Sequence, residues 1–114
     1  MRYITLIYLN AAQWDDRSEQ ERAAISAEYY AISEAPGVTG GDQLQPGATA
    51  TTVRVQDGQT LTTDGPFIET KEELGGYFLL EADDLDAAIE LAARIPAARL
   101  GGAVEVRPIV EMGH

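Results

Sequence analysis

The chain has 114 residues, 45% of them hydrophobic and 24% charged, which excludes disorder and predicts one domain over residues 1–114. Its 8 basic and 19 acidic residues give a net charge of −11, which would repel nucleic acid and anionic membranes, so we expect neither as a partner. Cysteine is absent, and no apolar stretch is long enough to span a membrane. We therefore expect a cytoplasmic protein.

The first third of the chain predicts a strand and a helix. Residues 3–9 are apolar or β-prone on both alternating faces, which is typical of a central strand covered on both sides. Residues 10–17 form a connection. After it, Ser18 and Glu21 form a capping box that starts a helix at about Glu19. Pro36-Gly37 ends this helix, whose apolar positions recur every three or four residues: Ala24, Ile25, Ala27, Ala31, Ile32 and Ala35.

The middle of the chain predicts a hairpin. A loop at Gly40-Gly41 leads to an extended piece near residues 42–45, and residues 49–56 then alternate between apolar and polar side chains. The Asp57-Gly58 dipeptide is the strongest local hairpin signal available. We expect residues 49–56 to pair with residues 59–63.

The last third predicts a strand, a helix and a final strand. Residues 76–82 are apolar on both faces, which indicates a second central strand, and residues 103–112 form the last strand. Asp83 or Asp84 caps the helix between them, and Pro96 ends it. We expect one apolar stripe on this helix, made of Leu85, Ala88, Ile89, Ala92 and Ile95.

The order of these elements predicts an α+β fold, a ferredoxin-like βαββαβ sandwich with an extra central hairpin strand. Both helices of this topology lie on one face of the sheet, yet two strands are apolar on both faces. An uncovered apolar sheet would be much larger than the patches that monomers tolerate. We therefore expect a homodimer in which two sheets pack face to face across a two-fold axis.

The most distinctive segment is Asp64-Gly65-Pro66-Phe67, in which Pro66 fixes its own φ and keeps Gly65 out of helical geometry, so we expect a stiff, irregular loop. With this motif the chain resembles the DGPF branch of the YCII-related family over nearly its whole length. The resemblance implies a ferredoxin-like fold of the dimeric α+β-barrel type. Its other motifs are residues 2–3, 41–46, 69–77, 96–101 and 104–108.

The resemblance also implies chemistry and partners. Related proteins of the shorter branch place a histidine of the first helix beside an aspartate, which implies acid–base or lyase-type chemistry on small molecules. Here the histidine is His114, and the first helix carries Tyr29 and Tyr30 instead, so the imidazole base cannot be carried over. Extracytoplasmic-function sigma factors are the regulatory partners that the resemblance suggests.

We predict a small-molecule cleft that contains the stiff loop. Asp64 is a candidate catalytic base or substrate anchor, or it is an Asx-turn acceptor that pins the loop. Arginine forks recognise carboxylates and phosphates, although each arginine could instead serve a structural ion pair, and Phe67 and Tyr29 could simply pack. The candidate ligand-binding residues are Tyr29, Arg54, Gly65, Pro66, Phe67, Arg99 and Arg107.

Three functional hypotheses remain open from the sequence. The first is a homodimer that binds a small molecule, with or without catalysis, and the second is an accessory protein of a sigma factor. The third is a dimer whose motif only stabilises its loop. Asp83, Asp84 and Asp86 lack the spacing of a calcium loop, and the phosphate-loop, G-x-S-x-G and H-E-x-x-H motifs are missing. We therefore expect no metal and no cofactor.

Overall fold

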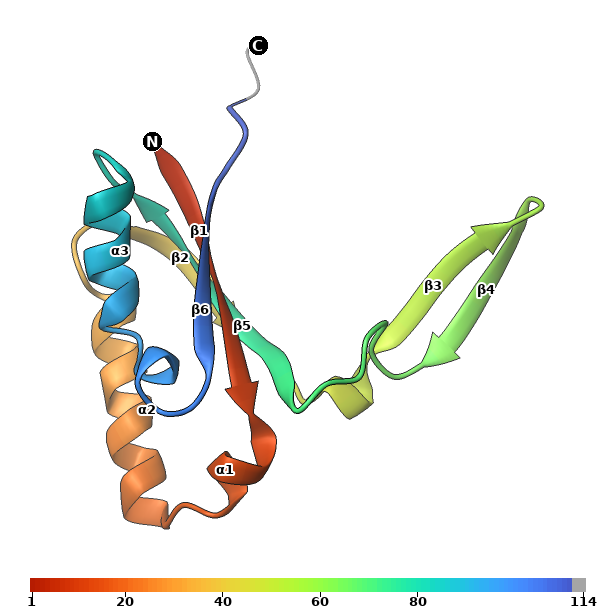
Figure 1. The fold of residues 1–114 in the computed structure, drawn as a ribbon, viewed down its shortest axis with the longest axis horizontal. Helices are drawn as coiled ribbons and strands as arrows, with labels where there is room; N and C mark the ends of the chain where they lie inside the picture. Colours follow the sequence, from red (N-terminus) through yellow and green to blue (C-terminus); the bar gives the residue numbers. More distant parts are fainter. Residues whose placement is uncertain (112–114) are drawn as a thin grey trace.

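The computed structural model describes residues 1–111, which form a helix-covered sheet and a hairpin that projects away from it (Figure 1). Capping signals account for the starts of the helices, because Ser18 accepts a hydrogen bond from the backbone of Glu21 and Asp84 accepts one from Ala87. The elements in chain order are β1 (Arg2–Asn10), α1 (Ala11–Asp15), α2 (Glu19–Ser33), β2 (Val38–Gln43), the 3-10 turn η1 (Gly47–Thr49), β3 (Thr51–Gln56), β4 (Gln59–Asp64), β5 (Glu72–Glu81), α3 (Leu85–Ala93), the 3-10 turn η2 (Pro96–Ala98) and β6 (Ala103–Pro108).

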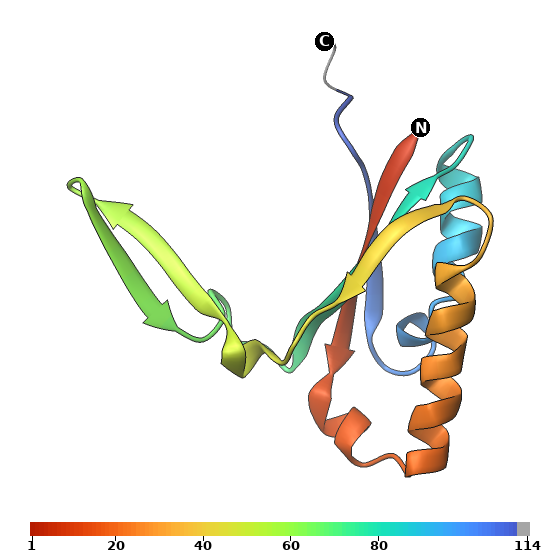
Figure 2. The ribbon, with the colours of Figure 1, turned by 180° about the vertical axis from the view of Figure 1, so that it is seen from behind.

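The main sheet has four antiparallel strands in the order β2-β5-β1-β6, which is the strand order of a ferredoxin-like fold. Helices α2 and α3 both lie against one face of it (Figure 2). At its centre Thr5 pairs with Phe78, and the fully buried Thr5 hydroxyl lies 3.2 Å from both the backbone N and the backbone O of Phe78. The predicted fold class is confirmed.

The hydrophobic core lies between this sheet and the two helices. The sheet contributes every second residue of its two central strands, as the period of a strand requires. On the helix side, Ile32 from α2 and Ala88 from α3 pack into the same core. The buried core cluster consists of Tyr3, Ile7, Ile32, Phe78, Leu80, Ala88, Ile95 and Ala97.

The buried apolar faces of α2 and α3 contain fewer residues than the sequence predicts. On α2 only Ile25 and Ile32 are buried, and the alanines at 24, 27 and 31 are exposed, because alanine serves helix propensity there rather than packing. On α3, Leu85 and Ile89 are 48% and 47% exposed. This helix packs over β6, an edge strand, so the outer part of its apolar stripe extends beyond the sheet.

The second face of the sheet is apolar and open. We call it the open sheet face, and no helix or strand within residues 1–111 covers it. Pairing register places on it apolar and aromatic side chains of the two central strands, Ile4, Leu6, Tyr8, Tyr77 and Leu79, and charged side chains of the two edge strands, Asp42, Glu105 and Arg107. The predicted apolar residues on both faces of β1 and β5 are thus present, and the homodimer they suggest stays a prediction.

The predicted hairpin is confirmed, but it does not join the main sheet. Asp57 and Gly58 have φ values of 50° and 76°, the two left-handed positions of a type I′ turn. Strands β3 and β4 pair with each other alone, as a separate two-stranded sheet. The extra hairpin therefore lies in the middle of the chain as predicted, and the structure places it outside the sandwich.

Several predicted boundaries are also corrected. Gly40 and Gly41 lie inside β2 rather than in a loop, and β5 begins at Glu72, before the predicted start. A register shift between Val38 and Gly40 marks a bulge, which suits a glycine. Strand β6 ends at Pro108, and the predicted strand position Met112 lies outside the described residues.

Candidate functional site

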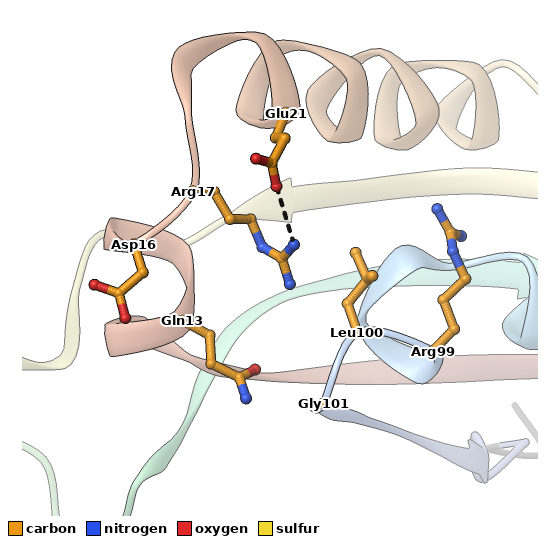
Figure 3. A pocket seen from close by; sticks show the side chains of 7 residues that line it. All are labelled: Gln13, Asp16, Arg17, Glu21, Arg99, Leu100 and Gly101. Carbon is orange, nitrogen blue, oxygen red and sulfur yellow. Dashed lines mark ion pairs between the residues drawn. The ribbon is translucent and has the colours of Figure 1, made fainter.

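A polar hollow lies where α1, the start of α2 and the turn after η2 meet (Figure 3). It is shallow and widely open to solvent, with a volume of about 510 Å³. Arg17 faces it from one side and the Leu100 turn from the other. The residues that line it are Gln13, Asp16, Arg17, Glu21, Arg99, Leu100 and Gly101.

Helix α1 forms one wall of the hollow. The Asn10 side chain caps this helix by accepting a hydrogen bond of 3.3 Å from the backbone N–H of Gln13. Across the hollow, Gly101 has a φ of +87°, and a Cβ at this position would lie 2.5 Å from the Gln13 side-chain oxygen. Glycine at 101 therefore leaves the room that the Gln13 amide occupies.

Arg17 is a half-buried charged group of the hollow and forms an ion pair with Glu21 (Figure 3). Its Nη1 lies 3.7 Å from Glu21 Oε2, a distance too long for a strong hydrogen bond. The Ser18 hydroxyl also holds Glu21, because it lies 3.2 Å from Glu21 Oε1 and 3.1 Å from the Glu21 backbone N. This capping box confirms the prediction, and the Arg17 guanidinium makes this ion pair but no hydrogen bond within residues 1–111.

Arg99 reaches the hollow from the other side and is already paired. Its Nη2 lies 2.8 Å and 2.6 Å from the two carboxylate oxygens of Glu28 on α2. This structural ion pair, one of the alternatives that the sequence leaves open, fixes the turn after η2 to α2. The other guanidinium nitrogens of Arg99 make no hydrogen bond within residues 1–111.

Tyr29 lies close enough to Arg99 and Glu28 to feel their charges, but it is not among the residues that line the hollow. Its hydroxyl oxygen is buried and has no hydrogen-bond partner within residues 1–111. Burial raises the pKa of Tyr29, and the Ala97 backbone and the Arg99 charge oppose that rise. A buried, neutral phenol without a partner is a packing group in this arrangement.

The other predicted site residues lie elsewhere. Phe67 follows the hairpin, and the Arg54 guanidinium carbon lies 4.7 Å from the centre of its ring, a cation–π contact. Asp64 ends β4 as an exposed residue. Arg107 lies on β6, where it pairs with Glu105 at 3.2 Å on the open sheet face, at its edge.

The stiff loop has the predicted irregular geometry. Gly65 has a φ of +97°, its N–H donates to Ala50 over 2.7 Å, and its carbonyl accepts from the Thr52 hydroxyl over 2.9 Å. None of the side-chain hydrogen bonds in the part of the chain that the structure describes involves the Asp64 carboxylate. The Gly65 backbone pins the loop, and Pro66 beside it is partly buried.

Within one chain, the structure thus separates the predicted site residues into three places. Arg99 lies at the hollow with Tyr29 close to it, Arg107 lies at the edge of the open sheet face, and Arg54 with residues 64–67 lies at the hairpin. Sequence reasoning missed the rest of the hollow because it treated residues 10–17 as a plain connection. The signal was Asn10 followed three residues later by Gln13, a helix-start pattern.

Comparison with known proteins identifies the family. The YCII-related domain matches residues 1–113. The chain belongs to the YCII-related domain family. It is also similar to an uncharacterized protein of Rhizobium meliloti (strain 1021), with 34% identity over 96 residues, which are 83% of this chain and 75% of that protein. The family resemblance seen in the sequence is confirmed, while the assignment to its DGPF branch stays a prediction.

Two further observations concern the described part of this YCII-related chain. No helix within residues 1–111 is both long and apolar enough to cross a membrane. The same residues contain no cluster of three or more histidine or carboxylate side chains placed to hold a metal ion. The sole histidine, His114, lies outside the described residues.

Proposed function

We propose that this YCII-related protein works as a homodimer that binds a small polar molecule in the hollow between α1, α2 and the Leu100 turn. The observation that carries the proposal is the convergence of two arginines from separate elements, Arg17 and Arg99, on one hollow of about 510 Å³. Both keep guanidinium N–H groups that are not used within residues 1–111.

The lining favours a particular chemistry of ligand. A guanidinium with free N–H groups binds a carboxylate, and Gln13 can donate or accept a hydrogen bond. Asp16 and Glu21 supply acceptors for a hydroxyl or ammonium group of the same molecule. A small hydroxy or amino acid carries both kinds of group, so this class is the proposed ligand.

The proposed chemistry moves away from Asp64. Proton transfer on a molecule bound in the hollow falls to Asp16 or Glu21, because Asp64 lies on the hairpin. The homodimer is supported by the open sheet face, whose apolar side chains no element within residues 1–111 covers. A second copy would cover this face by the same contact in both directions.

Ligand retention and one matched pair of variants test the proposal. Native mass spectrometry of protein purified from its own cells should show a dimer that carries a small extra mass. Thermal-shift titration with four- to six-carbon hydroxy and amino acids should then identify binders, and Arg17→Gln should weaken their binding about tenfold, the value of one charged hydrogen bond.

The control variant is Arg94→Gln, which removes an exposed arginine at the end of α3, outside the hollow. It should bind as the unaltered protein does. Equal binding by Arg17→Gln and the unaltered protein would overturn the assignment of the hollow. A retained basic protein in place of a small molecule would favour the accessory function with a sigma factor.

A further inference from the structure

The hairpin is the most exposed part of the molecule. We call β3, β4 and the following residues up to Ile68 the arm. Every residue of its two strands is exposed except Thr52, which is half-buried. Four apolar side chains of the arm are more than half exposed: Val53 at 59%, Val55 at 66%, Phe67 at 64% and Ile68 at 70%.

Such an arm does not stabilise itself. A single two-stranded hairpin is marginally stable in water unless a third strand or a packed face supports it. None of the arm residues belongs to the buried core cluster of the described chain. Its root is tied to β5 by one hydrogen bond of 3.3 Å from the Gly47 N–H to Glu73. The strands therefore need a surface outside this chain to pack against.

The two faces of the arm differ in chemistry. Antiparallel register places Thr51, Val53 and Val55 on one face, together with Thr60, Thr62 and, opposite Thr51 at the root of the arm, Asp64. All of these side chains except Asp64 are uncharged and β-branched, and we call Thr51, Val53, Val55, Thr60 and Thr62 the valine face. The opposite face carries Arg54, which already covers the Phe67 ring. The valine face is thus the one suited to burial.

The exposed surface area of the molecule favours a second copy of the chain as the partner that the arm packs against. A chain of 12.3 kDa is expected to expose about 6,100 Å². This chain exposes 8059 Å², about 2,000 Å² more, whereas each partner of an ordinary stable interface buries about 800 Å². The surplus exceeds what one sheet contact needs and leaves area for the arm.

The net charge of the chain limits the surfaces through which two copies can associate. Two copies that each carry a net charge of −11 repel each other, so they associate through uncharged surfaces. The valine face and the centre of the open sheet face are both of that kind, because their charged neighbours lie at the margins: Asp64 at the root of the arm, and Asp42, Glu105 and Arg107 on the edge strands of the sheet. We infer that the arm of each subunit clasps the other subunit through its valine face, beyond the edge of the sheet contact. This inference rests on the homodimer proposed above.

A double variant and a matched control test the arm. Val53→Lys with Val55→Lys places two charges on the valine face, and Leu61→Lys places one on the opposite face of the same hairpin. In sedimentation equilibrium, the double variant should raise the dimer dissociation constant about a hundredfold or more, because two valine side chains lose their burial. Leu61→Lys should change it less than about threefold.

The outcomes separate the two proposals. If the unaltered protein is a monomer, the homodimer and the arm inference both fail. If it is a dimer and the double variant dimerises equally well, the arm inference alone is overturned. Equal weakening by the double variant and by Leu61→Lys would overturn the choice of the valine face. Fluorescence of the single tryptophan, Trp14, reports whether the body of each variant is folded.

Hydrogen exchange gives an independent reading. If the arm clasps a second copy, the backbone amides of β3 and β4 should exchange slowly in the dimer and faster on dilution into monomers. Exchange of these amides that is equally fast at every protein concentration would overturn the inference, whatever the effect of the variants.

Discussion

At the scale of single residues, Tyr29 is the predicted ligand-binding residue whose surroundings most clearly indicate a packing role instead. Its hydroxyl is buried and makes no hydrogen bond of ordinary geometry within residues 1–111, and the Ala97 backbone and the charges of Arg99 and Glu28 act on it. We expect Tyr29→Phe to leave the free energy of unfolding unchanged or to raise it by up to about 1 kcal/mol. Urea denaturation measures this, and a loss of stability larger than that would mean that the hydroxyl has a partner.

Tyr29→Phe should also change how the free energy of unfolding depends on pH under alkaline conditions. Burial raises the pKa of Tyr29 in the folded protein, so its contribution is complete below the ordinary tyrosine value of about 10 and is lost as the pH rises through the folded value. Tyr29→Phe should therefore lose less stability above that pH. A hydrogen bond to Asp42 raises the pKa of Tyr77 in the same direction, so part of the loss should remain.

At the scale of elements, two adjacent glycines of β2 have different roles. A Cβ on Gly41 would lie 2.5 Å from the Tyr77 carbonyl oxygen, whereas one on Gly40 would lie 3.5 Å from Leu79 Cδ1, an ordinary contact. We expect Gly41→Ala to destabilise the protein by about 1–3 kcal/mol, because the strands must move apart. Gly40→Ala is the control and should change stability by less than about 1 kcal/mol. Thermal denaturation compares the two variants, and equal stability would contradict the packing of β2 on β5.

The elements also show which features the sequence predicts. Strong local signals, such as the Ser18 capping box and the Asp57-Gly58 turn, placed α2 and the hairpin correctly. Composition misled where tertiary contacts decide. Gly40 and Gly41 resemble a loop, yet both lie within a strand, and close approach to β5 selects glycine at position 41.

The candidate site was less predictable than the fold. The hollow brings Gln13 and Arg17 together with Arg99, more than eighty positions away in the chain, through the packing of the α1 region against the turn after η2. No spacing in a single sequence encodes such a contact. The Asp64 loop is distinctive in the sequence because its local chemistry is unusual. In the structure, this loop forms the root of the arm, where the Gly65 backbone bonds to Ala50 and Thr52.

At the scale of the whole molecule, the chain is less compact than a globular domain of its length. The radius of gyration is 16.1 Å, against about 13 Å for a compact chain of this length. The arm, which projects away from the helix-covered sheet, accounts for the difference (Figure 1). The net charge of −11 opposes the association of two copies, so we expect them to meet at the valine face and at the centre of the open sheet face, where charge is lowest.

Sedimentation equilibrium of the unaltered protein at neutral pH tests the central claim, that a second copy covers the open sheet face. We expect a single species of twice the 12.3 kDa chain mass at micromolar concentration. Leu79→Lys, which places a charge on the open sheet face, should shift that species toward the monomer. A mass of one chain at all concentrations would rule out the homodimer.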